Sequence, residues 1–306
     1  MSIHVTFLGT AGAIPTNQRS LPAVLVQRGN EQIMFDCGEA VQRQMVKAKV
    51  GFHKKLKIFV THMHGDHVLG LPGLLQTMAL MDRQKPVQIY GPVGVVQFLR
   101  CLQETLQFAL TFQAEIHELT GPGIVCDEEE YTVVAAVSNH VVPSFAYCFA
   151  EKPRAGKFHP EKAHALGVPE GQAWSTLQHG KTLTMADGRK VEPADVTGPL
   201  RKGRKIVYTG DTRPFAEFAG FAAKADLVIH EATFDDSLAD KALVDGHSTP
   251  SQAAEEAKAA EAKSLVLTHV SARYIDTSIF LEQATKIFSN TRVAEDFLKL
   301  KLPLGE

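Results

Sequence analysis

The chain lacks the features that would place it in a membrane, outside the cell or on a nucleotide. None of its apolar runs approaches the ~18 residues needed to cross a membrane, and residues 1–5 lead directly into a strand-like segment. Its four cysteines have no Cys-x-x-Cys spacing, which argues against a disulfide framework or a thiolate zinc site. Residues 7–12 are Gly-rich but show neither G-x-G-x-x-G nor a Walker lysine, so they indicate a tight turn. We therefore expect a cytoplasmic protein without a membrane segment, whose cysteines are small buried hydrophobic residues.

The chain has an ordinary length and composition, but its charge is unevenly distributed along the sequence. With 306 residues, 44% hydrophobic and 22% charged, the chain is long enough for one large domain with an insertion or for two domains. The formal net charge is -2, yet residues 150–205 hold 11 Lys and Arg against 6 Asp and Glu, and the remainder holds 21 against 28. The segment 150–205 is therefore a local basic region, as a protein that binds nucleic acid requires.

The most informative segment is residues 61–67, which follows the apolar run 58–60. It contains three imidazoles and a carboxylate: His62, His64, Asp66 and His67. In an extended segment, side chains two apart point the same way, so His62 and His64 can reach one ion, while the following glycine lets the backbone turn the other two towards a second ion. Such ligands suit zinc, and also manganese or iron. The alternative is a His-rich surface loop.

Three further candidate ligands follow predicted strands elsewhere in the chain. His140 follows the strand 132–137, Asp211 follows 206–208, and His269 follows 265–267. In layered α/β folds, sites form outside the carboxyl ends of strands, so these distant residues are expected to meet in one crevice. Taken alone, a histidine after a strand is more often a hydrogen-bonded structural residue. Together with the first motif, the three indicate a two-metal site.

The set His62-x-His64-x-Asp66-His67, His140, Asp211 and His269 resembles the signature of the metallo-β-lactamase superfamily. The surrounding segments resemble the ribonuclease Z family, which processes the 3′ end of tRNA, and the resemblance extends over nearly the whole chain. These segments are residues 7–15, 35–39, 70–75, 90–92, 230–233, 246–249 and 268–274.

The resemblance implies two Zn²⁺ ions, with manganese or iron as alternatives. It assigns His62, His64 and His140 to one ion, Asp66, His67 and His269 to the other, and Asp211 to both. Such a pair activates a water that attacks the phosphodiester in line. The expected reaction removes the 3′ trailer of precursor tRNA after the discriminator base, which leaves a 3′-hydroxyl on the tRNA and a 5′-phosphate on the trailer. Asp66 resembles the proton acceptor for this water, or is mainly a ligand.

A general acid is needed to protonate the departing 3′ oxygen, and imidazole is the usual choice. His247 lies in a segment that resembles the family motif carrying this acid, and Glu231 resembles the carboxylate that orients it. His247 also stands at the start of a helix, because Thr249, Pro250 and Gln252 form a capping pattern; both interpretations can hold together. Ser271 and Arg273 are candidates for holding the scissile phosphate, or belong to a surface loop.

We predict a four-layer αβ/βα sandwich, in which two mixed sheets are covered by helices. Residues 1–149 and 206–306 form this catalytic domain, with helices at 70–82, 93–107 and 250–263. The segment 150–205 has no sustained apolar periodicity and is too long for an ordinary loop of a compact domain. It is expected to be an inserted arm.

In the ribonuclease Z family, such an arm, the exosite, grips the body of the tRNA. The predicted phosphate contacts are Lys157, Lys162, Lys181, Arg189 and Lys190. Gln172 departs from the family pattern, because it occupies the position where a proline is expected. The alternative is a solvated loop with extra lysines.

The resemblance also implies a homodimer in which the arm of one subunit serves the site of the other; no other protein partner is indicated. Two alternatives remain open: a two-metal hydrolase that acts on a small phosphodiester, and a catalytically silent tRNA-binding protein. The remaining histidines, among them His230, lack ligand spacing and are expected to be structural or exposed.

Overall fold

Two seven-stranded β-sheets form the centre of the larger of two compact units. The structure is a computed structural model that describes residues 2–304. The first sheet has the order β18 (Lys299–Leu302), β1 (Ile3–Gly9), β3 (Ala23–Arg28), β4 (Glu31–Phe35), β5 (Lys55–Phe59), β6 (Val87–Pro92) and β7 (Ala114–Leu119). The second has the order β17 (Thr291–Val293), β15 (Leu265–Thr268), β14 (Leu227–Glu231), β13 (Lys205–Tyr208), β10 (Phe145–Glu151), β9 (Tyr131–Val137) and β8 (Gly123–Asp127). A short parallel pair joins β2 (Ala11–Gly12) to β16 (Val270–Ser271).

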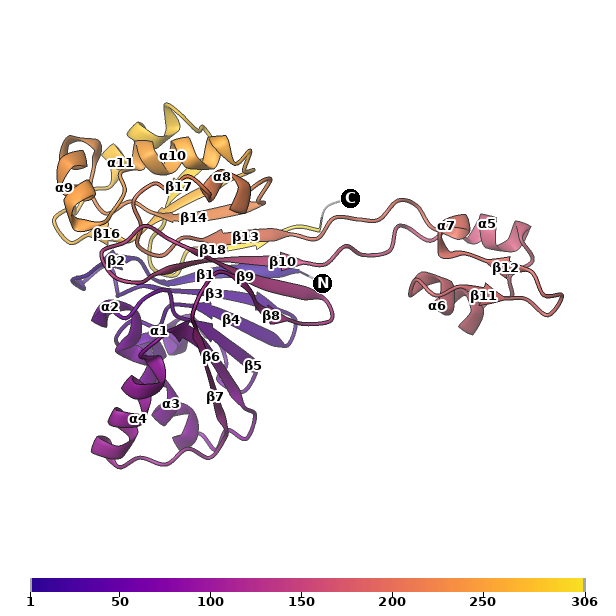
Figure 1. Ribbon diagram of the computed structural model, residues 1–306, viewed down its shortest axis with the longest axis horizontal. Coiled ribbons are helices and arrows are strands. Elements are labelled where there is room, and N and C mark those ends of the chain that lie inside the picture. Colours follow the sequence, from indigo (N-terminus) through magenta and orange to yellow (C-terminus); the bar gives the residue numbers. More distant parts are fainter. Residues whose placement is uncertain (1, 305–306) are drawn as a thin grey trace. The chain divides into compact units, whose positions relative to one another are not determined.

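The sheets pack face to face and helices cover their outer faces, as Figure 1 shows for this unit. Aromatic side chains from both sheets fill the space between them: Phe35 stacks on Tyr208 at 5.4 Å, and Phe59 lies 5.4 Å from Tyr147. The helices on the first sheet are α1 (Val41–Lys47), α2 (Gly65–Val68), α3 (Gly70–Leu80) and α4 (Val95–Leu106). Those of the second half are α8 (Phe218–Phe221), α9 (Ala239–Asp245), α10 (Pro250–Ala259) and α11 (Ser278–Thr285), with a 3₁₀ turn, η1 (Asp236–Leu238). The predicted four-layer sandwich is confirmed.

The direction of the central strands decides where a site can form. Strands β4 to β7 are mutually parallel, as are β13, β14, β15 and β17. Parallel strands end at the same edge of a sheet, so the residues that follow them lie close together. Helix α10 begins at this edge of the second sheet with the predicted capping box, in which Thr249 accepts from the Gln252 backbone and Gln252 accepts from the Thr249 backbone.

The prediction that all four cysteines are buried is wrong for one of them. Cys37, Cys126 and Cys148 are buried, but Cys101 is exposed, because it lies on the outer face of the amphipathic helix α4. The predicted helices 70–82, 93–107 and 250–263 correspond to α3, α4 and α10, each shorter at one end or both. Within residues 2–304, no helix is long and apolar enough to span a bilayer.

The segment Glu151–Arg204 forms the second compact unit. Its elements are α5 (Pro160–Ala165), α6 (Gln172–Gln178), β11 (Leu183–Thr184), β12 (Lys190–Val191) and α7 (Pro193–Val196). A small core of its own holds it together, in which Leu177 and Val196 are fully buried and the Trp174 indole donates to the Val168 carbonyl at 3.1 Å. The lack of long apolar periodicity therefore reflects short elements and not the absence of a folded unit. We refer to this unit as the arm.

One hydrogen bond between the sheets gives a test of the packing. The Tyr147 hydroxyl on β10 donates to the Val60 carbonyl, directly after β5, at 2.6 Å, and both groups are buried. Tyr147→Phe leaves that carbonyl without its donor and is expected to lower the free energy of unfolding by about 1–3 kcal/mol, measured by urea denaturation. Tyr131 is the matched control, since it is equally buried and its hydroxyl has no hydrogen-bond partner within residues 2–304. Tyr131→Phe should change stability by less than about 0.5 kcal/mol; equal losses in both variants would contradict this assignment.

Candidate metal centre

The seven predicted ligands meet at the carboxyl ends of strands from both sheets. The segment after β5, which includes the start of α2, supplies four of them, and the segments after β9, β13 and β15 each supply one. They form two adjacent groups whose ligand atoms lie within 4.8 Å of one another: His62, His64, His140 and Asp211 in one, and Asp66, His67 and His269 in the other. Four of the seven are buried, while His64, Asp66 and His140 are partly exposed, so the site is open on one side.

The first group brings three ring nitrogens together. The His64 Nδ1 atom lies 3.0 Å from His62 Nε2 and 3.3 Å from His140 Nε2. The Asp211 carboxylate is 3.7 Å from His62 Nε2. Burial lowers the pKa of both His62 and His140, so the rings are neutral and their lone pairs are available to a cation.

Asp211 also belongs to the second group. Its two carboxylate oxygens lie 3.4 Å from His67 Nε2 and 3.3 Å from His269 Nε2. The Asp66 carboxylate approaches the same two nitrogens at 3.3 and 3.4 Å. Burial would raise the pKa of Asp211, but the neighbouring His269 and His67 hold it well below its usual range. An ionised carboxylate is thus placed between the two groups, as a bridging ligand requires.

Four of the five ligand rings are held by a contact to Nδ1, which leaves Nε2 directed at the centre. The contacts are Thr61 Oγ1 to His62 at 3.0 Å, Asp36 Oδ2 to His67 at 2.7 Å, the Gly246 carbonyl to His140 at 2.8 Å, and Thr233 Oγ1 to His269 at 2.9 Å. His64 differs, since it presents Nδ1 to the group. Contacts of this kind fix the tautomer and orientation of histidine ligands.

The donor set fits divalent cations. His67 Nε2 and Asp211 Oδ1 are fully buried and have no hydrogen-bond partner within residues 2–304. Buried polar atoms without a partner cost free energy, and a bound cation removes that cost. Imidazole nitrogens with carboxylate oxygens are ligands that zinc takes, and that manganese and iron also accept. The donor set therefore fits a divalent metal site, and the seven residues predicted as ligands are the ones that meet here.

Glycines let neighbouring backbone come close to the ligands. Gly246 has φ +88°, and a Cβ added there would lie 2.7 Å from His140 Nδ1. A Cβ on Gly12 would lie 2.9 Å from His269 Nδ1. Since real Cβ atoms do not approach so closely, any larger residue at either position must displace a ligand ring. His269 itself has φ +59°, an uncommon conformation for a side chain of its size.

The predicted acid lies beside the second group. His247 Nδ1 is 2.8 Å from Glu231 Oε1, and Glu231 is 1% exposed. Burial alone would lower the pKa of His247, but the Glu231 carboxylate outweighs burial and raises it to about 9. His247 is therefore protonated at neutral pH, as a general acid must be. His230, next in sequence to Glu231, is buried and bonded to Glu256, so it is a structural residue.

The two predicted phosphate contacts lie on the segment after His269. The Arg273 guanidinium is exposed, approaches Ser271 Oγ at 3.3 Å and lies 4.9 Å from the centre of the Phe234 ring. Phe234 is buried and its ring is 6.0 Å from that of His247. Lys241 approaches the same ring at 5.3 Å. Two cationic side chains thus contact the Phe234 ring, which itself lies near His247.

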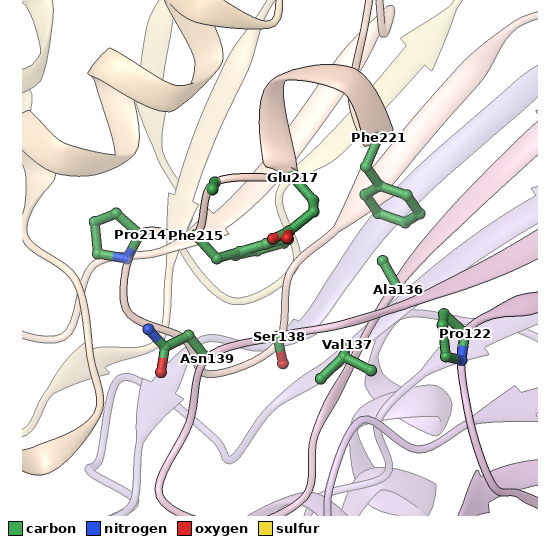
Figure 2. A pocket seen from close by; sticks show the side chains of 10 residues that line it. Pro122, Ala136, Val137, Ser138, Asn139, Pro214, Phe215, Glu217 and Phe221 are labelled. Atoms are coloured by element: carbon green, nitrogen blue, oxygen red, sulfur yellow. The ribbon is translucent and has the colours of Figure 1, made fainter.

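A cavity of about 780 Å³ lies on the residues that precede His140 (Figure 2). Val137, Ser138 and Asn139 line it on one side, and Phe215 and Phe221 on the other. Its lining is largely apolar and contains none of the seven ligands. Glu217 is the one titratable residue among those that line it, so the cavity lacks the cluster of titratable side chains that the metal centre has.

Sequence reasoning missed the residues that orient the ligands. Asp36, Gly246 and Thr233 lie in motifs that were recognised, yet no role was assigned to them. Asp36 carries the clearest signal, because it is a carboxylate directly after the apolar strand β4. The roles of Gly246 and Thr233 depend on contacts with residues 106 and 36 positions away.

Comparison with known proteins agrees with this site. A family model described as a beta-lactamase superfamily domain matches residues 127–270, and one described as anti-Pycsar protein Apyc1 matches residues 3–143. Fold and paired ligand groups together define a member of the metallo-β-lactamase superfamily.

Proteins of similar sequence identify the family to which the chain belongs within this superfamily. Proteins named ribonuclease Z are 44% identical in Methanosarcina acetivorans, over 98% of both chains, and 43% identical in Archaeoglobus fulgidus, over 100% of both. The structure of human tRNase Z, short form, matches with a TM-score of 0.74 and 32% identity, over 98% of this chain and 99% of that one. The chain belongs to the ribonuclease Z family.

The contact between Gly246 and His140 gives a test of the first ligand group. Gly246→Ala is expected to displace the His140 ring and to lower the affinity for one metal equivalent by about 10–100-fold, measured by zinc titration against a chromophoric chelator. Gly94→Ala is the matched control: Gly94 also has positive φ, at +110°, but nothing lies within 4 Å of its added Cβ. Both variants place alanine at positive φ, which costs about 1–3 kcal/mol of backbone strain in each. If Gly94→Ala weakens metal binding as much, strain and not the His140 contact is responsible.

Proposed function

We propose that the chain is a zinc-dependent endoribonuclease that removes the 3′ trailer from precursor tRNA by cutting after the discriminator base. The observation that carries this proposal is the complete site: two ligand groups that share Asp211, beside a protonated His247. Hydrolysis of a phosphodiester by an external water needs both parts. The proposal of an RNA substrate depends on the relatives, which are named ribonuclease Z and match over 98–100% of this chain.

His62, His64, His140 and Asp211 would hold one Zn²⁺, and Asp66, His67, His269 and Asp211 the other. When bound, such a pair lowers the pKa of a shared water and offsets the charge that develops on the phosphate. Asp66 is ionised, since its pKa is held far below its usual range by the adjacent His67 although burial opposes this. The Ala13 backbone N–H donates to the same carboxylate at 3.1 Å. An ionised Asp66 is what both proposed roles, ligand and proton acceptor, require.

His247 would supply the proton that the departing 3′ oxygen needs. The proton moves from the imidazolium to that oxygen as the phosphorus–oxygen bond breaks, so the tRNA leaves with a 3′-hydroxyl and the trailer keeps the phosphate. Glu231 stabilises the imidazolium before the reaction and orients the ring through its Nδ1 atom. Ser271 and Arg273 would hold the phosphate beside this acid, with Arg273 kept in place by its contact with Phe234.

The arm would bind the body of the tRNA. Lys157, Lys162, Lys181 and Lys190 are exposed and have no ion pair within residues 2–304, so they are available to phosphates. Arg189 differs, because Asp187 accepts from its Nε at 2.6 Å.

The departure at Gln172 does not disturb the arm locally. Gln172 is the first residue of α6, where a proline is favoured but any residue that forms helices is tolerated. The family likeness also leads us to propose a homodimer, which sedimentation of the purified protein would test.

The direct test of the function is cleavage of a tRNA that carries a 3′ trailer, with the new ends mapped. We expect one cut after the discriminator base, abolished by a chelator and in His64→Ala. A protein that carries two metal equivalents but leaves this RNA intact while hydrolysing a small phosphodiester would be a small-substrate hydrolase. One that binds the tRNA and hydrolyses neither would be a silent tRNA-binding protein.

The acid role of His247 can be separated from metal binding by the choice of leaving group. His247→Asn is expected to slow precursor tRNA cleavage by about 10²–10⁴-fold, the usual contribution of a general acid. Hydrolysis of bis(4-nitrophenyl) phosphate should change little, because 4-nitrophenolate leaves without a proton. A comparable loss on both substrates would show that His247 acts in some other way.

The arm lysines should affect RNA binding and leave the chemistry unchanged. Replacing Lys157, Lys162, Lys181 or Lys190 by Ala is expected to raise KM for precursor tRNA, and removing one lysine–phosphate interaction should reduce the slope of log affinity against log salt by about 1. Hydrolysis of bis(4-nitrophenyl) phosphate is the internal control and should not change. Arg189→Ala should have a smaller effect, since Arg189 is already bound to Asp187. An unchanged salt dependence in all four lysine variants would contradict the role of the arm.

A further inference from the structure

We propose that Thr233 is a positioning residue whose hydroxyl connects the metal ligand His269 to the Glu231 carboxylate that orients the acid. This inference rests on the proposed function in taking His247 as the acid and His269 as a ligand of one of two zinc ions. Thr233 lies just after the end of β14 and is 5% exposed. Its side chain lies where the metal centre and the acid adjoin, yet it is neither a predicted ligand nor a group that can transfer a proton at neutral pH.

The hydroxyl of Thr233 has polar neighbours on both sides. Its Oγ1 atom lies 2.7 Å from Glu231 Oε2, 2.9 Å from His269 Nδ1 and 3.2 Å from His247 Nδ1. A hydroxyl has one proton to donate and two lone pairs that accept. The three neighbours are therefore not equivalent, and the direction of each hydrogen bond can be assigned.

Glu231 determines these directions. Burial would raise the pKa of Glu231, but the adjacent His247 lowers it, so the carboxylate is ionised and can only accept. Thr233 must then donate its single proton to Glu231 Oε2. It follows that Thr233 accepts from its other neighbours, and the shorter of these contacts is the one from His269 Nδ1.

This assignment selects the tautomer of His269. A ring that binds a metal through Nε2 carries its proton on Nδ1, and the Nε2 atom of His269 faces Asp66 at 3.4 Å and Asp211 at 3.3 Å. That is the nitrogen a metal must meet. The Gly12 backbone packs against the same side of the ring, since a Cβ there would lie 2.9 Å from His269 Nδ1. Thr233 thus provides the acceptor that keeps His269 in its ligating form.

The same carboxylate serves the acid through its other oxygen. Glu231 Oε1 accepts from His247 Nδ1 at 2.8 Å, while Oε2 accepts from the Thr233 hydroxyl and from its backbone N–H at 3.1 Å. Removing the Thr233 hydroxyl would break the connection to His269 and leave the Glu231–His247 contact in place. Metal binding and acid catalysis can therefore be disturbed separately.

The test is zinc titration of the full-length metal-free protein against a chromophoric chelator. Thr233→Val keeps the branched shape and removes the hydroxyl; we expect the affinity for one of the two zinc equivalents to fall by about 10–100-fold. Thr233→Ser restores the hydroxyl and should bind both equivalents within about threefold of the parent protein. At saturating zinc, Thr233→Val should recover most of its kcat on precursor tRNA, because His247 and Glu231 still pair.

One further variant distinguishes this proposal from a general packing effect, and the choice of measurement distinguishes it from failure of the proposed acid. Thr6 is fully buried and its hydroxyl has no hydrogen-bond partner within residues 2–304, so Thr6→Val should leave both zinc affinities unchanged. Zinc affinity is measured without RNA cleavage, so this result does not depend on whether His247 acts as the acid. The proposal is overturned if Thr233→Val binds both equivalents as tightly as the parent protein, or if Thr233→Ser loses as much affinity as Thr233→Val.

Discussion

The close approach of five imidazoles and two carboxylates is the constraint on which the rest of the structure depends. The ligand atoms of each group lie within 4.8 Å of one another, and at least two of the atoms, on His67 and Asp211, are buried without a hydrogen-bond partner within residues 2–304. Without a cation this arrangement is unfavourable, because each buried polar atom without a partner costs free energy. The parallel strand ends, the glycine contacts and the Nδ1 contacts all hold the rings in that arrangement. The affinity for metal therefore depends on the whole of the larger compact unit, which we call the catalytic unit.

Much of this could be predicted from the sequence. The motif after β5 and the ligands after β9, β13 and β15 were identified because each polar group follows an apolar strand, a local pattern. The capping box of α10 was identified for the same reason. What escaped prediction depends on distant contacts: Thr233 orients a ring 36 positions away, and Gly246 one that is 106 positions away. The exposure of Cys101 was missed because composition does not say which face of a helix is outside.

The arm shows how composition can be informative and still incomplete. Its excess of lysine and arginine marked residues 150–205 as different, but gave no sign of the small core around Leu177 and Val196. That core lets the arm keep lysines exposed without help from the catalytic unit. Under the proposed function, the charge for RNA binding and the ligands for chemistry lie in two compact units, each with a core of its own.

The order of the ligands along the chain has a consequence for biosynthesis. The first ligand, His62, follows β5, whereas the last, His269, follows β15, and the first sheet is completed only when β18 pairs with β1. A ribosome-bound chain that ends before β15 has the His62–His67 loop but not the full ligand set. A domain of this topology folds as a unit once its strands are available. The second ligand group is therefore completed only after β15 has been synthesised, and a product truncated before β15 has no full metal site.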